Sequence, residues 1–169
     1  MYSIGYDIGS SSIKCSILDV EQGKVIAQGF YPNDEMPIQS PQPGWAEQDP
    51  NLWWDYLVTL TRKIMKENSI DTSKIKAIGI SYQMHGLVIV DKQHNVLRPS
   101  IIWCDSRAVE IGNDAFRKIG ETYCLRHLLN SPGNFTASKL RWVRENESEI
   151  YKKIYKAMLP GEFIAMKMT

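Results

Sequence analysis

Along the opening segment of the chain, apolar and polar residues alternate in the pattern of short strands. The runs 3–8, 13–20 and 24–31 are rich in β-branched and aromatic residues. Gly9-Ser-Ser-Ser12 and Glu21-Gln-Gly23 stand between these runs and supply turn residues. The pattern therefore predicts a three-stranded antiparallel meander.

The segment that follows is irregular and ends in a helix. Residues 32–50 carry five prolines and little periodicity, which is typical of a connection over the surface. Asp49 is a natural N-cap in front of Pro50, and the apolar positions then recur every three to four residues, as one buried helix face requires. These positions are Trp53, Leu57, Leu60 and Ile64. The spacing predicts a helix over about 50–68.

In the rest of the chain, strands alternate with helices. Strands are predicted at 75–81, 87–91 and 100–103. A helix capped by Asp105 or Ser106 is expected to end at Gly120. A third helix is expected to have Thr136 as its cap, with Leu140 and Val143 on the inner face. Further helices are predicted over Ile150 to Tyr155 and over 161–168, with a short strand at 157–159 between them.

A meander followed by alternating strands and helices predicts the α/β class, with a mixed sheet and helices packed on it. The last helical pattern is still apolar at Met168. We therefore expect the 169 residues to be part of a longer polypeptide.

Composition and charge exclude several classes of function. The chain is 43% apolar and 23% charged, which is typical of a globular domain. Its net charge of +1 gives no basic field for nucleic acid or an anionic membrane. The longest aliphatic run, 87–90, is too short to span a bilayer, and no secretory signal is visible.

The three cysteines, Cys15, Cys104 and Cys124, have no CxxC spacing. The number is odd, so the pattern favours neither a disulfide framework nor a zinc site. A reducing cytoplasm is the expected location.

The first candidate site is the turn that follows the first strand. Asp7 stands at the strand end, Gly9 and Ser10 to Ser12 form the turn, and Lys14 begins the next strand. Such a turn can aim backbone N–H groups and hydroxyls at a phosphate, and Asp7 can hold Mg²⁺ through water. Taken alone, the segment is better explained as a Gly-Ser hairpin turn with Asp7 as a surface or turn-capping residue.

The second candidate is the polar break between two predicted strands. Gln83 and His85 can hydrogen-bond the hydroxyls of a polyol, and Met84 can pack on its carbon face. A solvated histidine beside a turn is the competing interpretation.

The third and fourth candidates carry tryptophans. In Trp103-Cys-Asp105-Ser-Arg107 an acid and a base can reach a polar ligand beside a stacking indole. The simpler interpretation makes Asp105 or Ser106 a helix cap, leaves Arg107 solvated and puts Trp103 in the core. Trp45, after a Pro-Gly turn, is expected to pin the long loop.

These segments occur in an order that resembles the FGGY family of carbohydrate kinases, with the xylulose-specific branch most similar. The resemblance covers nearly the whole chain. It rests on the segments above together with Phe135-Thr-Ala-Ser-Lys139-Leu and Leu159-Pro-Gly-Glu-Phe.

The resemblance implies an actin-like, ribonuclease-H-like fold and ATP-dependent phosphorylation of a sugar, with the 5-hydroxyl of D-xylulose as the acceptor. By position, Asp7 would organise Mg²⁺ and phosphate, while Gly9, Ser10, Ser11, Ser12 and Lys14 would form the phosphate loop. The substrate-binding residues would be Gln83, Met84, His85 and Asp105. Gly86 after the histidine favours xylulose over gluconate, since serine is expected there in gluconate kinases.

Two departures and two alternatives accompany the resemblance. Tyr82 stands where a small residue is common, and Cys104 where a polar one is frequent.

Residues 1–169 would be an N-terminal domain, incomplete and inactive alone, without the C-terminal actin-like domain and its general base. The alternatives are a kinase acting on gluconate, ribulose or another polyol, and a non-catalytic sugar-binding lobe. A homodimer can form through exposed apolar surface.

Overall fold

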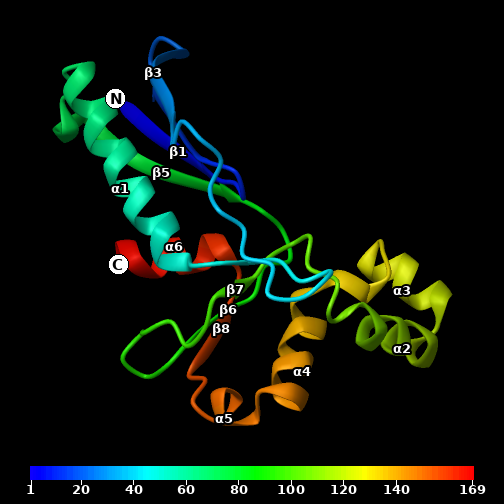
Figure 1. Cartoon of the computed structure of the whole chain (residues 1–169). Helices are drawn as coiled ribbons and strands as arrows, with labels where there is room; N and C mark the ends of the chain where they lie inside the picture. Colours follow the sequence, from blue (N-terminus) through cyan, green and yellow to red (C-terminus); the bar gives the residue numbers. More distant parts are fainter. The chain divides into compact units, whose positions relative to one another are not determined.

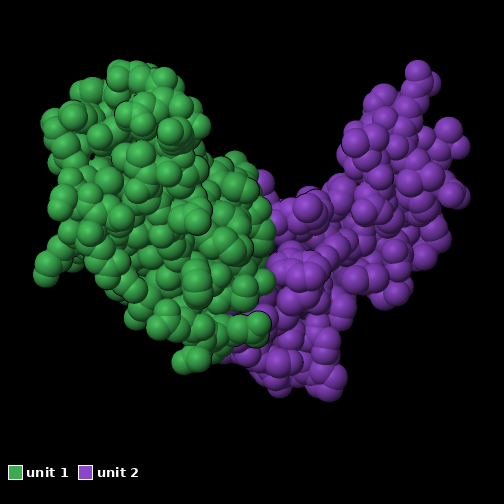
Figure 2. Space-filling model, turned by 90° about the horizontal axis from the view of Figure 1, so that it is seen from above, with its two compact units in different colours: residues 1–37, 50–83, 160–169 green, residues 38–49, 84–159 purple.

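The computed structural model describes residues 1–169, and the chain divides into two compact units (Figure 2). Unit 1 contains residues 1–37, 50–83 and 160–169, and unit 2 contains residues 38–49 and 84–159. None of the helices combines the length and the apolar character of a bilayer-spanning segment.

Unit 1 is built on a four-stranded mixed sheet in the order β3-β2-β1-β5. Strands β1 (Tyr2–Ile8), β2 (Ile13–Asp19) and β3 (Lys24–Tyr31) form the predicted antiparallel meander. Strand β5 (Ile75–Tyr82) follows a 3-10 turn, Thr72–Lys74, and pairs in parallel with β1. The meander and the mixed sheet are both confirmed.

Two helices pack on this sheet. The helix α1 (Pro50–Glu67) lies against β2 and β3 and buries the predicted face of Trp53, Leu57, Leu60 and Ile64. The helix α6 (Pro160–Met168) packs on α1 and β5 (Figure 1). Gly29 on β3 allows the close approach of α1, because a Cβ there would lie 3.3 Å from the Cδ1 of Ile64.

The interior of unit 1 contains two titratable groups beside each other, Tyr6 and Cys15, which are cross-strand partners. Burial raises the pKa of the Cys15 thiol from 9.0 to about 11. Burial also raises the pKa of Tyr6 to about 12, although its hydrogen bond with Thr61 acts in the opposite direction. Both groups are therefore held in their neutral forms.

We expect unit 1 to lose stability at alkaline pH through Cys15. Its thiol ionises more easily in the unfolded chain, so this stabilisation is complete below pH 9 and is lost as pH rises through about 11. Each pKa unit corresponds to about 1.4 kcal/mol. Urea unfolding between pH 8 and pH 11 should therefore show a shallower pH dependence for Cys15→Ala. Cys104→Ala, at an exposed thiol, is the control and should follow the wild type. Equal pH dependence in the wild type and Cys15→Ala would refute the assignment.

Unit 2 has two short antiparallel pairs and four helices. Strand β4 (Glu47–Gln48) pairs with β7 (Ser100–Ile101), and β6 (Val88–Val90) pairs with β8 (Lys156–Met158). The helices are α2 (Val109–Ile119), α3 (Glu121–Leu128), α4 (Thr136–Asn146) and α5 (Ser148–Tyr151), with a 3-10 turn at Pro132–Asn134. The core consists of Leu87, Ile89, Ile101 and Val143.

Several predicted boundaries in unit 2 are wrong. The helix expected from Asp105 or Ser106 begins at Val109, with Ala108 at the N-cap position and no side-chain cap. Neither predicted cap is available, because the Asp105 carboxylate accepts from Ala46 N and the Ser106 hydroxyl donates to the Gly44 carbonyl. The helix α4 does begin at Thr136, but the N-cap position is Phe135.

Two elements have no counterpart in the predictions. Gly120 ends α2 as expected, yet α3 follows it at once. Strand β4 lies inside the proline-rich segment. Its partner is β7, so its formation depends on residues about fifty positions away along the chain.

Candidate active site

The turn between β1 and β2 carries the first group of predicted site residues. Asp7 and Lys14 are cross-strand partners at the end of this pair where the turn joins the two strands. The Lys14 Nζ lies 3.0 Å from the Asp7 Oδ2, and about half of each side chain remains exposed. The structure therefore places a carboxylate and an ammonium together beside the predicted phosphate loop.

Gly9 determines the shape of this loop. Its N–H donates to the Ser12 carbonyl at 3.1 Å, which closes the turn. A Cβ at Gly9 would lie only 2.9 Å from the Ser12 carbonyl oxygen. The Ser11 carbonyl accepts from the buried Met36 N–H at 2.8 Å, which fixes the loop from its other side. The turn requires glycine and holds three consecutive serines.

The donors at this turn are compatible with Mg²⁺. No group of three or more His, Cys, Asp or Glu side chains forms a metal cage in the chain. Mg²⁺ in phosphoryl-transfer sites commonly takes one or two carboxylates, several waters and the phosphates of the substrate. The partly exposed Asp7 carboxylate beside serine hydroxyls is a donor set of that kind.

Gln83 lies next to the end of β1. Its N–H donates to the Ile8 carbonyl at 2.9 Å, which extends the β1–β5 pairing by one step. Its side-chain amide is buried, and neither the nitrogen nor the oxygen has a hydrogen-bond partner. An unpaired buried amide is costly, and the role of Gln83 in binding a polar ligand stays a prediction.

Met84 and His85 belong to unit 2. The Met84 side chain is exposed, as a surface offered to a ligand must be. The His85 ring stacks on Phe135 with the centroids 4.8 Å apart. Burial lowers the pKa of His85, and the positive charge of Lys139 lowers it further by a smaller amount. A neutral imidazole has one donor and one acceptor nitrogen, which suits a sugar hydroxyl.

Asp105 is completely enclosed. Its carboxylate accepts from Ala46 N at 2.6 Å, from Arg107 N at 2.9 Å and from the Arg107 guanidinium at 2.7–3.0 Å. Its side chain has no exposed surface. Direct contact of Asp105 with sugar stays a prediction, and the role that the contacts support is anchoring the 103–107 segment.

The burial of Arg107 and Trp103 is the opposite of what the simpler interpretation of their segment predicted. The Arg107 side chain, expected in solvent, is 1% exposed, whereas Trp103, expected in the core, is 47% exposed. The Arg107 guanidinium lies 3.7 Å from the Trp45 ring centroid and 4.9 Å from that of Trp142. Trp45 therefore pins its loop, as predicted, and does so through Arg107.

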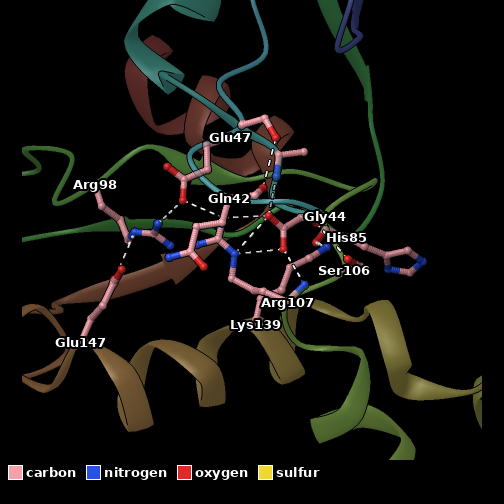
Figure 3. Close-up of polar contacts among 12 residues, drawn as sticks. Gln42, Gly44, Glu47, His85, Arg98, Ser106, Arg107, Lys139 and Glu147 are labelled. Carbon is pink, nitrogen blue, oxygen red and sulfur yellow. Dashed lines mark hydrogen bonds and ion pairs between the residues drawn. The ribbon is translucent and has the colours of Figure 1, made fainter.

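A buried ionic network that the motifs did not predict continues from Arg107. Its Nη2 lies 2.7 Å from the Glu47 carboxylate, which also pairs with Arg98. Arg98 contacts Glu147 at 3.1 Å (Figure 3). We define the Arg107 network as Glu47, Arg98, Asp105, Arg107 and Glu147. Its members lie far apart in the sequence, so no local pattern reveals it.

Comparison with known families decides the assignment. Residues 2–169 match the model of the FGGY family of carbohydrate kinases, N-terminal domain. The chain belongs to this family.

Individual members support the same assignment. The chain is 36% identical to the xylulose kinase of Escherichia coli (strain K12) over 98% of its own length, but it spans only 33% of that protein. A crystal structure of a xyloylose kinase from Brucella ovis superposes with a TM-score of 0.86 at 32% identity, with 98% of this chain and 34% of that one covered.

A gluconate kinase from Lactobacillus acidophilus superposes nearly as well. The TM-score is 0.83 at 28% identity, with 98% of this chain and 32% of that one covered. The expected actin-like fold is confirmed by these FGGY kinase structures. The chain spans about one third of the length of each of these relatives.

The two departures from the FGGY pattern have different structural settings. The Tyr82 ring lies against the backbone of Gly161, where a Cβ would fall 1.9 Å from the Tyr82 Cδ1. The bulk of Tyr82 is therefore accommodated by a glycine on α6. Cys104 is an exposed free thiol between Trp103 and Asp105.

Proposed function

We propose that this FGGY domain is the N-terminal part of a kinase that transfers the γ-phosphoryl group of ATP to the 5-hydroxyl of D-xylulose. The observation that carries the proposal is the β1–β2 turn, where Asp7 and Lys14 pair at 3.0 Å beside the glycine and serine loop. The identity to curated xylulose kinases and the Gln-Met-His-Gly segment favour xylulose among the FGGY substrates.

In this proposal the β1–β2 turn handles phosphate. Backbone N–H groups and hydroxyls of Ser10 to Ser12 bind phosphate oxygens, and Lys14 supplies a positive charge at the same edge. Asp7 would hold Mg²⁺ through water. When bound, Mg²⁺ neutralises the charge that develops on the phosphoryl oxygens.

The 83–86 segment handles the sugar. The Gln83 amide and the neutral His85 imidazole hydrogen-bond hydroxyls, while the exposed Met84 covers a carbon face. Alignment of the acceptor hydroxyl in line with the γ-phosphoryl group then accounts for much of the catalysis.

The proposal assigns the remaining parts of the site to a C-terminal actin-like domain. That domain would provide the general base and most of the adenosine site. No carboxylate among residues 1–169 is assigned as the base. We therefore expect the 169-residue chain alone to be inactive, and xylulose-dependent ADP release by this chain alone would contradict that expectation.

The test is coupled ADP release by the full-length protein with D-xylulose, D-ribulose, gluconate and glycerol. We expect D-xylulose to give the highest kcat/KM. Turnover with another of these compounds, but not with xylulose, would keep the kinase and change its substrate; gluconate is the strongest rival, given the gluconate kinase structure at a TM-score of 0.83. No turnover with any of them would favour the non-catalytic sugar-binding lobe.

A further inference from the structure

Lys139 on α4 is a lysine whose exposed fraction is 0%. Lysine is almost never fully buried unless its ammonium has partners. The Lys139 Nζ donates to the His85 carbonyl at 2.8 Å and to the Asn134 carbonyl at 3.1 Å. We call this group of three, Lys139 Nζ, His85 O and Asn134 O, the carbonyl clamp.

The carbonyl clamp holds His85 in a backbone conformation that is uncommon for residues other than glycine. The φ of His85 is 61°, in the left-handed region, which costs free energy for a residue with a Cβ. Such conformations persist where surrounding contacts over-determine them, and they cluster at functional sites. The bond from Lys139 to the His85 carbonyl is a contact of that kind.

The carbonyl clamp also reaches the ring that supports His85. Asn134 directly precedes Phe135, and the Phe135 ring stacks on the imidazole at 22° between planes. One ammonium therefore fixes the backbone of His85 and the backbone next to its stacking partner. Figure 3 shows Lys139 beside His85. Movement of either segment would reorient the imidazole.

The charges that face Lys139 come from the 104–107 segment and from His85. Burial is the main cause that lowers the pKa of Lys139 to about 8. Asp105 and Cys104 act to raise this pKa, whereas the positive charge of Arg107 acts to lower it. Lys139 in turn lowers the pKa of His85. The ammonium is therefore coupled to the imidazole through charge as well as through the backbone.

We infer that Lys139 is a positioning residue for sugar recognition, which acts by fixing the backbone and the ring of His85 through the carbonyl clamp. This inference rests on the proposed function, in which His85 contacts the sugar. Lys139 itself donates to two backbone carbonyls and has no exposed surface to offer a ligand.

The first test measures the imidazole directly, so it is independent of catalysis. The pKa of His85 is followed by NMR in the full-length wild type, Lys139→Met, Lys139→Arg and Lys153→Met, where Lys153 is an exposed lysine of the same unit. We expect the pKa to rise only in Lys139→Met, because only this change removes the nearby positive charge. A His85 pKa unchanged in folded Lys139→Met overturns the inference.

The second test separates positioning from simple stabilisation. We expect Lys139→Met to raise the KM for D-xylulose about tenfold, with the KM for ATP unchanged. Lys139→Arg, which keeps the charge and the donors, should recover part of the loss. Equal KM values for xylulose in folded Lys139→Met and in the wild type would overturn the inference. Absence of turnover with any sugar in the wild type would count against the proposed function. The NMR measurement of the His85 pKa would still test the inference about Lys139.

A third measurement needs no substitution at Lys139, so it does not depend on how Lys139→Met folds. His85-Gly86 is the only His-Gly pair in the 169 residues. Selective ¹³C-carbonyl histidine and ¹⁵N-glycine labelling reports its peptide bond, assigned by its loss in His85→Gln. We expect the His85 carbonyl shift to titrate with a midpoint near 8, as Lys139 loses its proton. A shift that stays flat from pH 7 to pH 9.5 would overturn the inference.

Discussion

We expect the Asp7→Asn full-length protein to lose about 10³-fold in kcat for xylulose phosphorylation, in line with the loss of one pre-organised group that stabilises transition-state charge. Asparagine keeps the size of the side chain but removes the negative charge that would organise Mg²⁺. The fold should be little affected, because about half of each side chain in the Asp7–Lys14 pair is exposed and surface ion pairs contribute little stability.

The matched control for Asp7 is Asp55→Asn, at an exposed carboxylate on α1 of the same unit. Its kcat should equal that of the wild type. Coupled ADP release at saturating ATP and xylulose measures both variants. A wild-type kcat in folded Asp7→Asn would remove Asp7 from the phosphate site.

We expect the second large effect at Asp105, on stability. Asp105→Ala removes the carboxylate that Arg107 and the Ala46 N–H share inside unit 2. Removing one partner of a buried ion pair leaves a buried charge with less compensation and costs about 3–5 kcal/mol. Urea unfolding followed by tryptophan fluorescence measures the loss, because Trp45 and Trp142 lie against Arg107.

Two further variants test the reason for this effect. Asp114→Ala removes a partly exposed partner of Lys118 on α2 and should change the free energy of unfolding little. The double variant Asp105→Ala/Arg107→Met should be more stable than Asp105→Ala, since it removes the buried charge itself. A loss below about 1 kcal/mol in Asp105→Ala would contradict a buried-pair role.

Much of unit 1 could be predicted from the sequence, because its elements depend on local patterns. The apolar spacing of Trp53, Leu57, Leu60 and Ile64 defines one helix face, and all four side chains are buried. Strands β1 to β3 are joined by short turns, so neighbours in sequence are also neighbours in the sheet. The predicted phosphate loop falls within this local part of the fold.

Unit 2 was less predictable because distant contacts override its local signals. Asp105 has the residue type of an N-cap, but its carboxylate is occupied by Ala46 N and by Arg107. Helix α3 lacks a continuous buried stripe, with Cys124 as its one buried residue, so periodicity gave no signal for it.

The candidate site divides in the same way. Asp7, Gly9 and Lys14 could be identified from one short segment, and the structure places Asp7 and Lys14 in contact. The importance of Lys139 could not, because its contacts with His85 and Asn134 exist only after α4 has packed. Sequence motifs gave the candidate ligand-binding residues, whereas the contacts that hold His85 required the fold.

The most direct test of the central claim is to identify the product of phosphoryl transfer. The full-length protein is incubated with ATP, Mg²⁺ and D-xylulose, and the product is analysed by ³¹P–¹H correlation NMR. The account predicts a phosphorus coupled to the two protons on carbon 5 in the wild type, and no such product with Asp7→Asn. Phosphate on another carbon, or no sugar phosphate from xylulose at all, would contradict the account.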